Sequence, residues 1–123
     1  MRPWLFVGAV NGFLAVLAGA FAAHGLQGRV DDRALAIFQT AAEYHLLHAL
    51  ATVAAALAAT RGRAALAQGA AALFTAGIVL FSGSLYYLVL AHSDALVLAT
   101  PIGGLAFLAG WAVLAVSALR SDI

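Results

Sequence analysis

The chain has 123 residues, of which 65% are hydrophobic and only 9% charged, whereas a soluble globular domain carries about 25% charged residues. It has no cysteine, which excludes disulfides, iron–sulfur clusters, thiolate zinc sites and a cysteine nucleophile. The hydrophobic and charged fractions exclude an ordinary soluble domain, and a net charge of only +1 leaves no basic surface for nucleic acid. Because one membrane span takes about 20 apolar residues, the length fits four spans in a single domain.

The first predicted span is residues 4–23, where Asn11 is the only polar side chain. At about 1.5 Å per residue, this helix is long enough to cross the hydrocarbon core. Asn11 is expected to form a hydrogen bond with another helix. The alternative is a signal peptide, because Arg2, the apolar run and the Ala-Phe-Ala sequence at 20–22 imitate its three regions. Three further spans keep the chain in the membrane in either case.

The second predicted span, residues 34–60, follows a polar break in which Asp31 or Asp32 is well placed to cap the helix. The third, residues 64–91, comes directly after the charged tip at 61–63. Because this turn is short, the two helices should be antiparallel neighbours. Positions at equal distance from the tip should then lie level with one another.

The fourth predicted span, residues 101–119, should have Thr100 as its N-cap and Pro101 as its first residue. The predicted fold is therefore all-α, an integral membrane four-helix bundle that forms a single four-span domain over residues 1–123.

The arginines predict the orientation of this domain. Four spans place both termini and the 61–63 tip on one side. The side of the termini has four arginines, namely Arg2, Arg61, Arg63 and Arg120. The opposite side has two, Arg29 and Arg33. The positive-inside rule then predicts cytoplasmic N- and C-termini for a multi-pass protein of the inner (plasma) membrane.

Small residues recur on one face of three predicted helices. Because lipid tails are as apolar as leucine, membrane helices associate through close contact and hydrogen bonds, which favours small residues. The glycines are the better indicator, since glycine in a helix interior costs about 1 kcal/mol. An alanine- and glycine-rich composition could also produce such stripes by chance. The expected packing positions are Gly8, Gly12, Gly19, Gly69, Gly83, Gly103 and Gly110.

Polar side chains in the predicted spans form a candidate site. Its members are His24, Gln39, Glu43, Tyr44, His45, His48, Ser82 and Ser84. Tyr44 and His48 are four residues apart and share a helix face, and the 61–63 tip places Glu43 level with Ser82. His24 is expected in the same half of the bilayer as His48. Ionisable groups at membrane depth are costly and indicate function by default.

Three interpretations of this cluster compete. In the first, Glu43 lies near the outer interface, where Arg33, Ser82 or Tyr87 satisfies it, and neutral histidines form hydrogen bonds between helices. In the second, Glu43 and the histidines carry protons or ions. In the third, His45 and His48 hold a metal or haem. No complete set of ligands can be read from the sequence, so no metal or other cofactor is expected.

Aromatic residues near the span ends suggest interfacial positions. Trp4 and the Tyr86-Tyr87 pair are typical of the belt at the membrane interface. Trp111 is too deep in its span for such a belt and is expected to pack inside. The sequence has no phosphate loop and no arrangement of a nucleophile with a base, so we expect no enzyme activity.

Four motifs in order resemble the Domain of Unknown Function 423 family, which includes YgdD-like and transmembrane protein 256-like small membrane proteins. The segments are Ala20-Phe21-Ala22-Ala23-His24-Gly25-Leu26, Phe38-Gln39-Thr40-Ala41 with Tyr44 and His48, Phe81-Ser82-Gly83-Ser84-Leu85-Tyr86, and Thr100-Pro101-Ile102-Gly103-Gly104 with Gly110-Trp111. The chain departs from the family pattern at Gln39, where an acid is common, and at Glu43, where a basic or polar residue is common. The resemblance implies a four-span inner-membrane protein and no particular activity.

We therefore expect a non-enzymatic helix-packing or interaction module in the lipid bilayer, with other membrane proteins or copies of itself as partners and no nucleic acid. The alternative is a small proton- or ion-coupled permeation protein that uses the intramembrane Glu and His groups.

Overall fold

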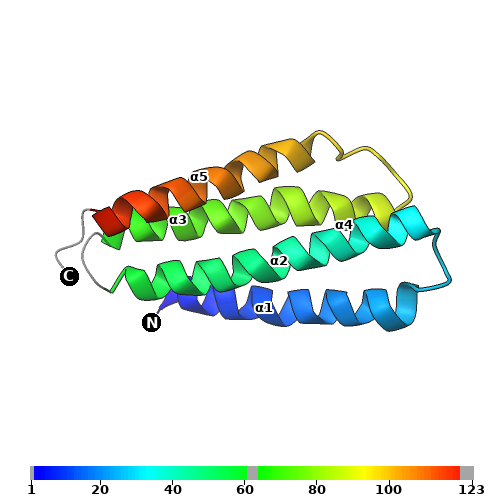
Figure 1. Ribbon diagram of the computed structural model, residues 1–123, viewed down its shortest axis with the longest axis horizontal. Coiled ribbons are helices and arrows are strands. Elements are labelled where there is room, and N and C mark those ends of the chain that lie inside the picture. Colours follow the sequence, from blue (N-terminus) through cyan, green and yellow to red (C-terminus); the bar gives the residue numbers. More distant parts are fainter. Residues whose placement is uncertain (1, 61–63, 120–123) are drawn as a thin grey trace.

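The computed structural model describes residues 2–60 and 64–119, and its four spans are helical (Figure 1). The elements are α1 (Pro3–Phe21), the π-helical turn η1 (Ala22–Leu26), α2 (Asp32–Ala58), α3 (Ala64–Gly77), the π-helical segment η2 (Ile78–Ser82), α4 (Gly83–Leu90) and α5 (Ala99–Leu119). α1 with η1 forms the first span, and α3, η2 and α4 together form the third. All four spans are long and apolar enough to cross a membrane, so the all-α membrane fold is confirmed.

Two expected helix starts have different outcomes. Asp31 is the N-cap of α2, because its side chain accepts a hydrogen bond from the Ala34 backbone N–H at 2.7 Å. The prediction for Thr100 is wrong. Helix α5 begins at Ala99, two residues before the predicted first residue Pro101, and the Thr100 hydroxyl forms a hydrogen bond with Ser84 of α4 instead.

The arginine-rich tip at 61–63 and Arg120 lie outside the described residues. Helices α2 and α3 on either side of the tip are nevertheless antiparallel neighbours, as expected. The start of α1, the end of α2, the start of α3 and the end of α5 lie at one end of the molecule (Figure 1). The connections at 27–31 and 91–98 lie at the other end.

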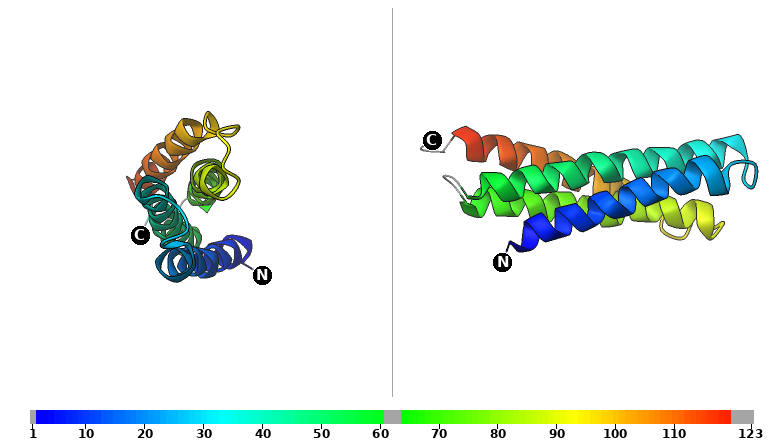
Figure 2. Two further views of the ribbon diagram at one scale, coloured as in Figure 1. Left: turned by 90° about the vertical axis from the view of Figure 1, so that its right-hand side faces the viewer. Right: turned by 90° about the horizontal axis from the view of Figure 1, so that it is seen from below.

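Helix α2 is the central element of the fold. Helix α1 packs along it, the third span packs against its other side, and α5 packs mainly on α3 and η2. Figure 2 shows α1 and α5 at opposite edges of the pair formed by α2 and the third span. The four spans therefore form an open series of neighbours around α2.

Small side chains make this packing tight. The core where α2 meets α3 consists of Ala51, Ala55, Ala70, Ala71 and one large residue, Phe74, all buried. Most other large apolar side chains point outward, as with Phe13, which is 70% exposed. In a bilayer those side chains contact lipid, so the contacts between helices come from close approach of the small residues.

Three of the expected glycines lie at close contacts between helices. A Cβ atom on Gly8 would stand 2.8 Å from a Val53 side-chain carbon of α2, and one on Gly110 would stand 2.7 Å from the Phe74 ring. A Cβ atom on Gly103 would collide with the backbone of Phe81 in η2. Gly77, which the stripes did not include, is similarly covered by Phe107.

The expected contacts at the other four glycines are absent among the residues that the structure covers. No atom lies within 4 Å of a Cβ built on Gly12, Gly19 or Gly69. Around Gly83, the nearest atom is the Ile78 carbonyl oxygen of the same span, at 3.9 Å. Helix α1 buries Gly8 and Ala15 instead, so a regular spacing of small residues did not identify the face in contact.

Candidate functional site

His45 connects three helices through both nitrogens of its ring. Its Nε2 lies 2.9 Å from Oδ1 of Asn11 on α1, and its Nδ1 lies 2.8 Å from the Tyr86 hydroxyl on α4. The ring itself is buried on α2. The interhelical role expected for Asn11 is thus present, with His45 as its partner.

The direction of these hydrogen bonds follows from Asn11. Its Nδ2 donates to the Val7 carbonyl oxygen at 3.0 Å, so its Oδ1 is the atom that faces His45. Because an amide oxygen can only accept, Nε2 of His45 carries a proton and donates it. In the neutral ring Nδ1 is then the acceptor for the Tyr86 hydroxyl.

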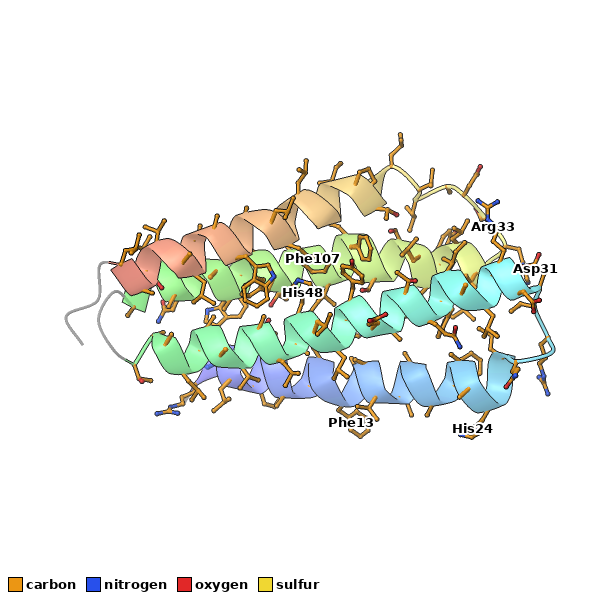
Figure 3. All side chains as sticks on the ribbon, in the orientation of Figure 1. Phe13, His24, Asp31, Arg33, His48 and Phe107 are labelled. Carbon is orange, nitrogen blue, oxygen red and sulfur yellow. The ribbon has the colours of Figure 1, made fainter. Side chains whose placement is uncertain are left out.

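His48, one turn further along α2, connects to a different set of neighbours. Its Nδ1 donates to the Tyr44 carbonyl oxygen at 2.8 Å, and Trp111 Nε1–H of α5 donates to its Nε2 at 3.1 Å. The ring also stacks on Phe107 of α5, with centroids 3.6 Å apart and planes 10° apart. Figure 3 shows His48 and Phe107 turned toward one another between the helices.

These contacts determine which ring nitrogen of His48 carries a proton. An indole N–H can only donate, so the Nε2 atom that faces Trp111 has no proton. The Tyr44 carbonyl can only accept, so Nδ1 does have one. His48 is therefore neutral in this arrangement, and adding a proton at Nε2 would break the hydrogen bond to Trp111.

Ser82 and Ser84 also form hydrogen bonds between spans. The buried Ser82 hydroxyl donates to the Ala41 carbonyl oxygen of α2 at 2.8 Å. Ser84, two residues later, pairs with Thr100 of α5 and also donates to the Phe81 carbonyl oxygen. Ser82 is thus close to the level that distance from the 61–63 tip predicted.

Gln39 and Glu43 do not join this network. Both side chains are exposed on the outer side of α2, and neither forms a hydrogen bond or an ion pair with the residues that the structure describes. The expectation that Arg33, Ser82 or Tyr87 satisfies Glu43 is therefore wrong within the described chain. Ser82 instead uses its hydroxyl on the α2 backbone.

His24 is also separate from the other histidines. It is exposed on the π-helical turn η1 and points away from the other helices (Figure 3). Asp32, at the same end of the molecule, is 16 positions before His48, or roughly 24 Å of helix. The prediction that His24 and His48 share one half of the bilayer is therefore wrong, because α2 carries His48 past its own midpoint.

Sequence reasoning missed the aromatic partners of the two histidines. Tyr86 was expected at the membrane interface, but its hydroxyl faces His45. Trp111 was expected to pack inside, but its side chain is 46% exposed, and its indole N–H donates to His48. Tyr44 stacks with His48, as their spacing predicted. A count of positions from the 61–63 tip would have placed Tyr86 level with Phe38, so this contact with His45 could not be found in that way.

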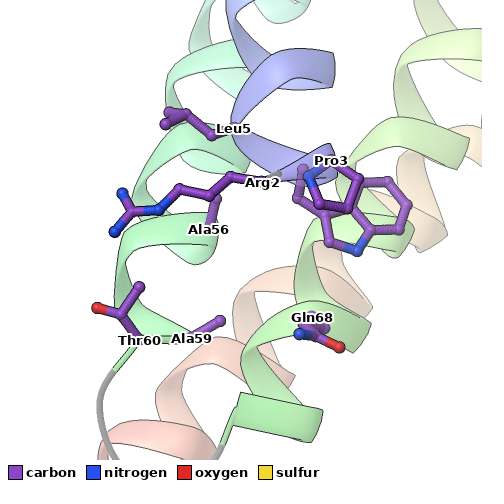
Figure 4. Close-up of a pocket in the computed structure, with 8 residues that line it drawn as sticks. Arg2, Pro3, Leu5, Ala56, Ala59, Thr60 and Gln68 are labelled. Atoms are coloured by element: carbon purple, nitrogen blue, oxygen red, sulfur yellow. The ribbon is translucent and has the colours of Figure 1, made fainter.

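The hollows on the surface of the bundle include the following two. An open groove of about 520 Å³ lies between α1 and the third span, with apolar walls apart from Asn11, His45 and Tyr86. A second hollow, of about 200 Å³, lies at the end where α1 begins (Figure 4). There Arg2 extends beside Ala56 of α2. Over residues 2–60 and 64–119, no three His, Asp or Glu side chains come together as metal ligands would.

Comparison with known proteins gives consistent matches over the length of the chain. The family model described as "Protein of unknown function (DUF423)" matches residues 18–104. The UPF0382 membrane protein YwdK of Bacillus subtilis is 42% identical over 121 residues, with 98% of each chain covered. The UPF0382 inner membrane protein YgdD of Escherichia coli K12 is 40% identical over 97% of this chain and 91% of its own. No solved structure matches the chain.

Proposed function

The chain belongs to the DUF423 family of membrane proteins, and on that premise we propose that it is a non-enzymatic interaction module of the inner membrane. In this proposal its buried polar residues hold the four spans together. Its outer surface binds another membrane protein.

The hydrogen bonds of His48 carry this proposal. A proton relay needs a group that can gain and lose a proton while it stays in contact with the next group along the path. Nε2 of His48 faces the donor-only indole of Trp111, so it cannot take up a proton without losing that partner. His45 is bonded to different helices, and no described residue bridges the two rings. The arrangement favours a structural role over a permeation pathway.

A flux measurement tests this role against permeation. Proteoliposomes that contain the protein should be no more permeable to protons than protein-free liposomes, and the purified protein should contain no stoichiometric metal on elemental analysis. The same result is expected for His48→Gln and Glu43→Gln. Flux or bound metal that disappears in His48→Gln, at unchanged thermal stability, would overturn the structural interpretation, since glutamine neither titrates near neutrality nor replaces an imidazole ligand.

The proposed orientation places both termini in the cytoplasm. It is supported by the excess of arginine on the side of the termini. The inner membrane as its location is supported by the Escherichia coli relative, which is named an inner membrane protein. At a fusion after Ile123, a reporter enzyme that works only in the cytoplasm should be active, and one that works only after export should be inactive. At an insertion after Asp94 the result should be the reverse: the reporter that works only after export should be active. Export of the reporter at Ile123 would show that the orientation is inverted.

A further inference from the structure

One side of α2 exposes polar groups where lipid would contact them. We call this the α2 outer face and define it by five exposed residues: Ala36, Gln39, Thr40, Glu43 and Leu47. Their spacing of three and four residues places them on one side of the helix. The face is turned away from both α1 and the third span, against which α2 packs.

Glu43 lies deep in the membrane on this face. It is 11 positions after Asp32 and 15 before Ala58 at the ends of α2, or roughly 16 Å and 22 Å along the axis. It is thus a few ångströms from the midpoint of the helix, and its short side chain cannot reach either interface. A carboxyl group exposed to hydrocarbon at this depth is costly unless a partner donates hydrogen bonds to it.

No described residue donates a hydrogen bond to Glu43, and this includes Gln39 one turn earlier on the same helix. Ser82, near the same level, donates to the Ala41 carbonyl oxygen. Arg33 is ten positions before Glu43 on α2, or roughly 15 Å along the axis. Within residues 2–60 and 64–119 of a single copy, the Glu43 carboxyl group therefore has no hydrogen-bond donor.

We propose that a second copy of this chain covers the α2 outer face, with the Gln39 amide of each copy donating to the Glu43 carboxyl group of the other. This inference rests on the proposed function as an interaction module and names its partner. The face is complementary to itself, because an amide donor and a carboxyl acceptor lie one helical turn apart. A twofold axis along the membrane normal keeps equivalent residues of the two copies at equal depth, so both hydrogen bonds form together. The small Ala36 and Thr40 side chains permit close approach.

Cysteine cross-linking in native membranes tests the contact directly. The chain has no cysteine, so each single-cysteine variant reports on one position. Oxidation should link copies of Thr40→Cys and Leu47→Cys. Controls at Phe13→Cys on α1 and Leu105→Cys on α5, which are 70% and 65% exposed, should remain monomeric. Linking at the control positions but not on the α2 outer face would overturn the proposal.

Exchange of the donor and the acceptor tests the chemistry. Measured by energy transfer between labelled copies in phosphatidylethanolamine–phosphatidylglycerol vesicles, Glu43→Leu and Gln39→Leu should each weaken association by about tenfold, the scale of losing interhelical hydrogen bonds. The double variant Gln39→Glu with Glu43→Gln should associate like the parent, because it retains one donor and one acceptor in each copy. Helical content and thermal stability of the separated copies should be unchanged in all variants, since both side chains are exposed and neither forms a hydrogen bond with a described residue of another span.

Each other outcome contradicts a specific statement. Equal association of the parent and both leucine variants, or a parent that stays monomeric at high protein-to-lipid ratio, would overturn the second copy as partner. Cross-linking of Thr40→Cys to a different membrane protein alone would do the same. The proposed function is tested separately, by the proton flux and bound metal of the parent protein. Failure of the dimer without proton flux or bound metal is therefore distinguishable from failure of the proposed function.

Discussion

Gly103→Ala should lower the free energy of unfolding by about 2 kcal/mol, the usual scale of overpacking, whereas Gly104→Ala should leave it unchanged or raise it slightly. The two glycines are adjacent on α5, and each replacement brings a similar gain in helix propensity. A Cβ atom on Gly103 would collide with the backbone of Leu80 and Phe81 in η2, and backbone cannot move aside as the end of a side chain can. Among the residues that the structure describes, no atom of another span lies within 4 Å of a Cβ on Gly104.

Thermal unfolding of both variants in the same detergent measures this difference. The neighbouring substitution controls for helix propensity, expression and detergent binding. If Gly104→Ala were as destabilising as Gly103→Ala, this would contradict the close contact of α5 with η2 at Gly103.

His45→Leu should also cost about 2 kcal/mol, because it removes two interhelical hydrogen bonds, each contributing about 1 kcal/mol, and leaves Asn11 and Tyr86 without their partner. Tyr86→Phe removes only one of the two bonds and should cost about half as much. Combining the two substitutions should cost less than the sum of the single effects, because both remove the same hydrogen bond between His45 and Tyr86.

A spectroscopic measurement separates the hydrogen bonds from general packing. In ¹⁵N-labelled protein, His45 should have its proton on Nε2 and His48 on Nδ1, since Asn11 and Tyr44 present only acceptors to those atoms. Additive costs in the double variant, or the same tautomer for both rings, would contradict the arrangement around α2.

The spans were predictable from the sequence because composition and length determine them. Apolar runs of the required length occur four times, and a polar break precedes the second span, with Asp31 as the cap. The ends were less predictable. The π-helical turn η1 extends the first span beyond His24, and the hydroxyl of Thr100 pairs with Ser84 across helices instead of capping α5.

The candidate site was predictable only in part. Spacing along one helix correctly paired Tyr44 with His48, because such neighbours are set by local geometry. The Trp111 partner of His48 could not be found in this way, since it depends on how α5 leans across the bundle. Which glycines of α1 face α2 also depends on how the helices pack, since Gly8 makes a close contact there and Gly12 does not.

The central position of α2 also determines the order in which the fold can be completed during synthesis. The first two spans leave the ribosome before the third, so Asn11 and His45 can meet before the third span has been inserted. Arrival of α4 then brings Tyr86 to the same ring. Only the last span supplies Trp111 and Phe107 to His48. Each histidine is thus completed at a different stage of membrane insertion, and α5 docks last onto a surface that the preceding three spans have already formed.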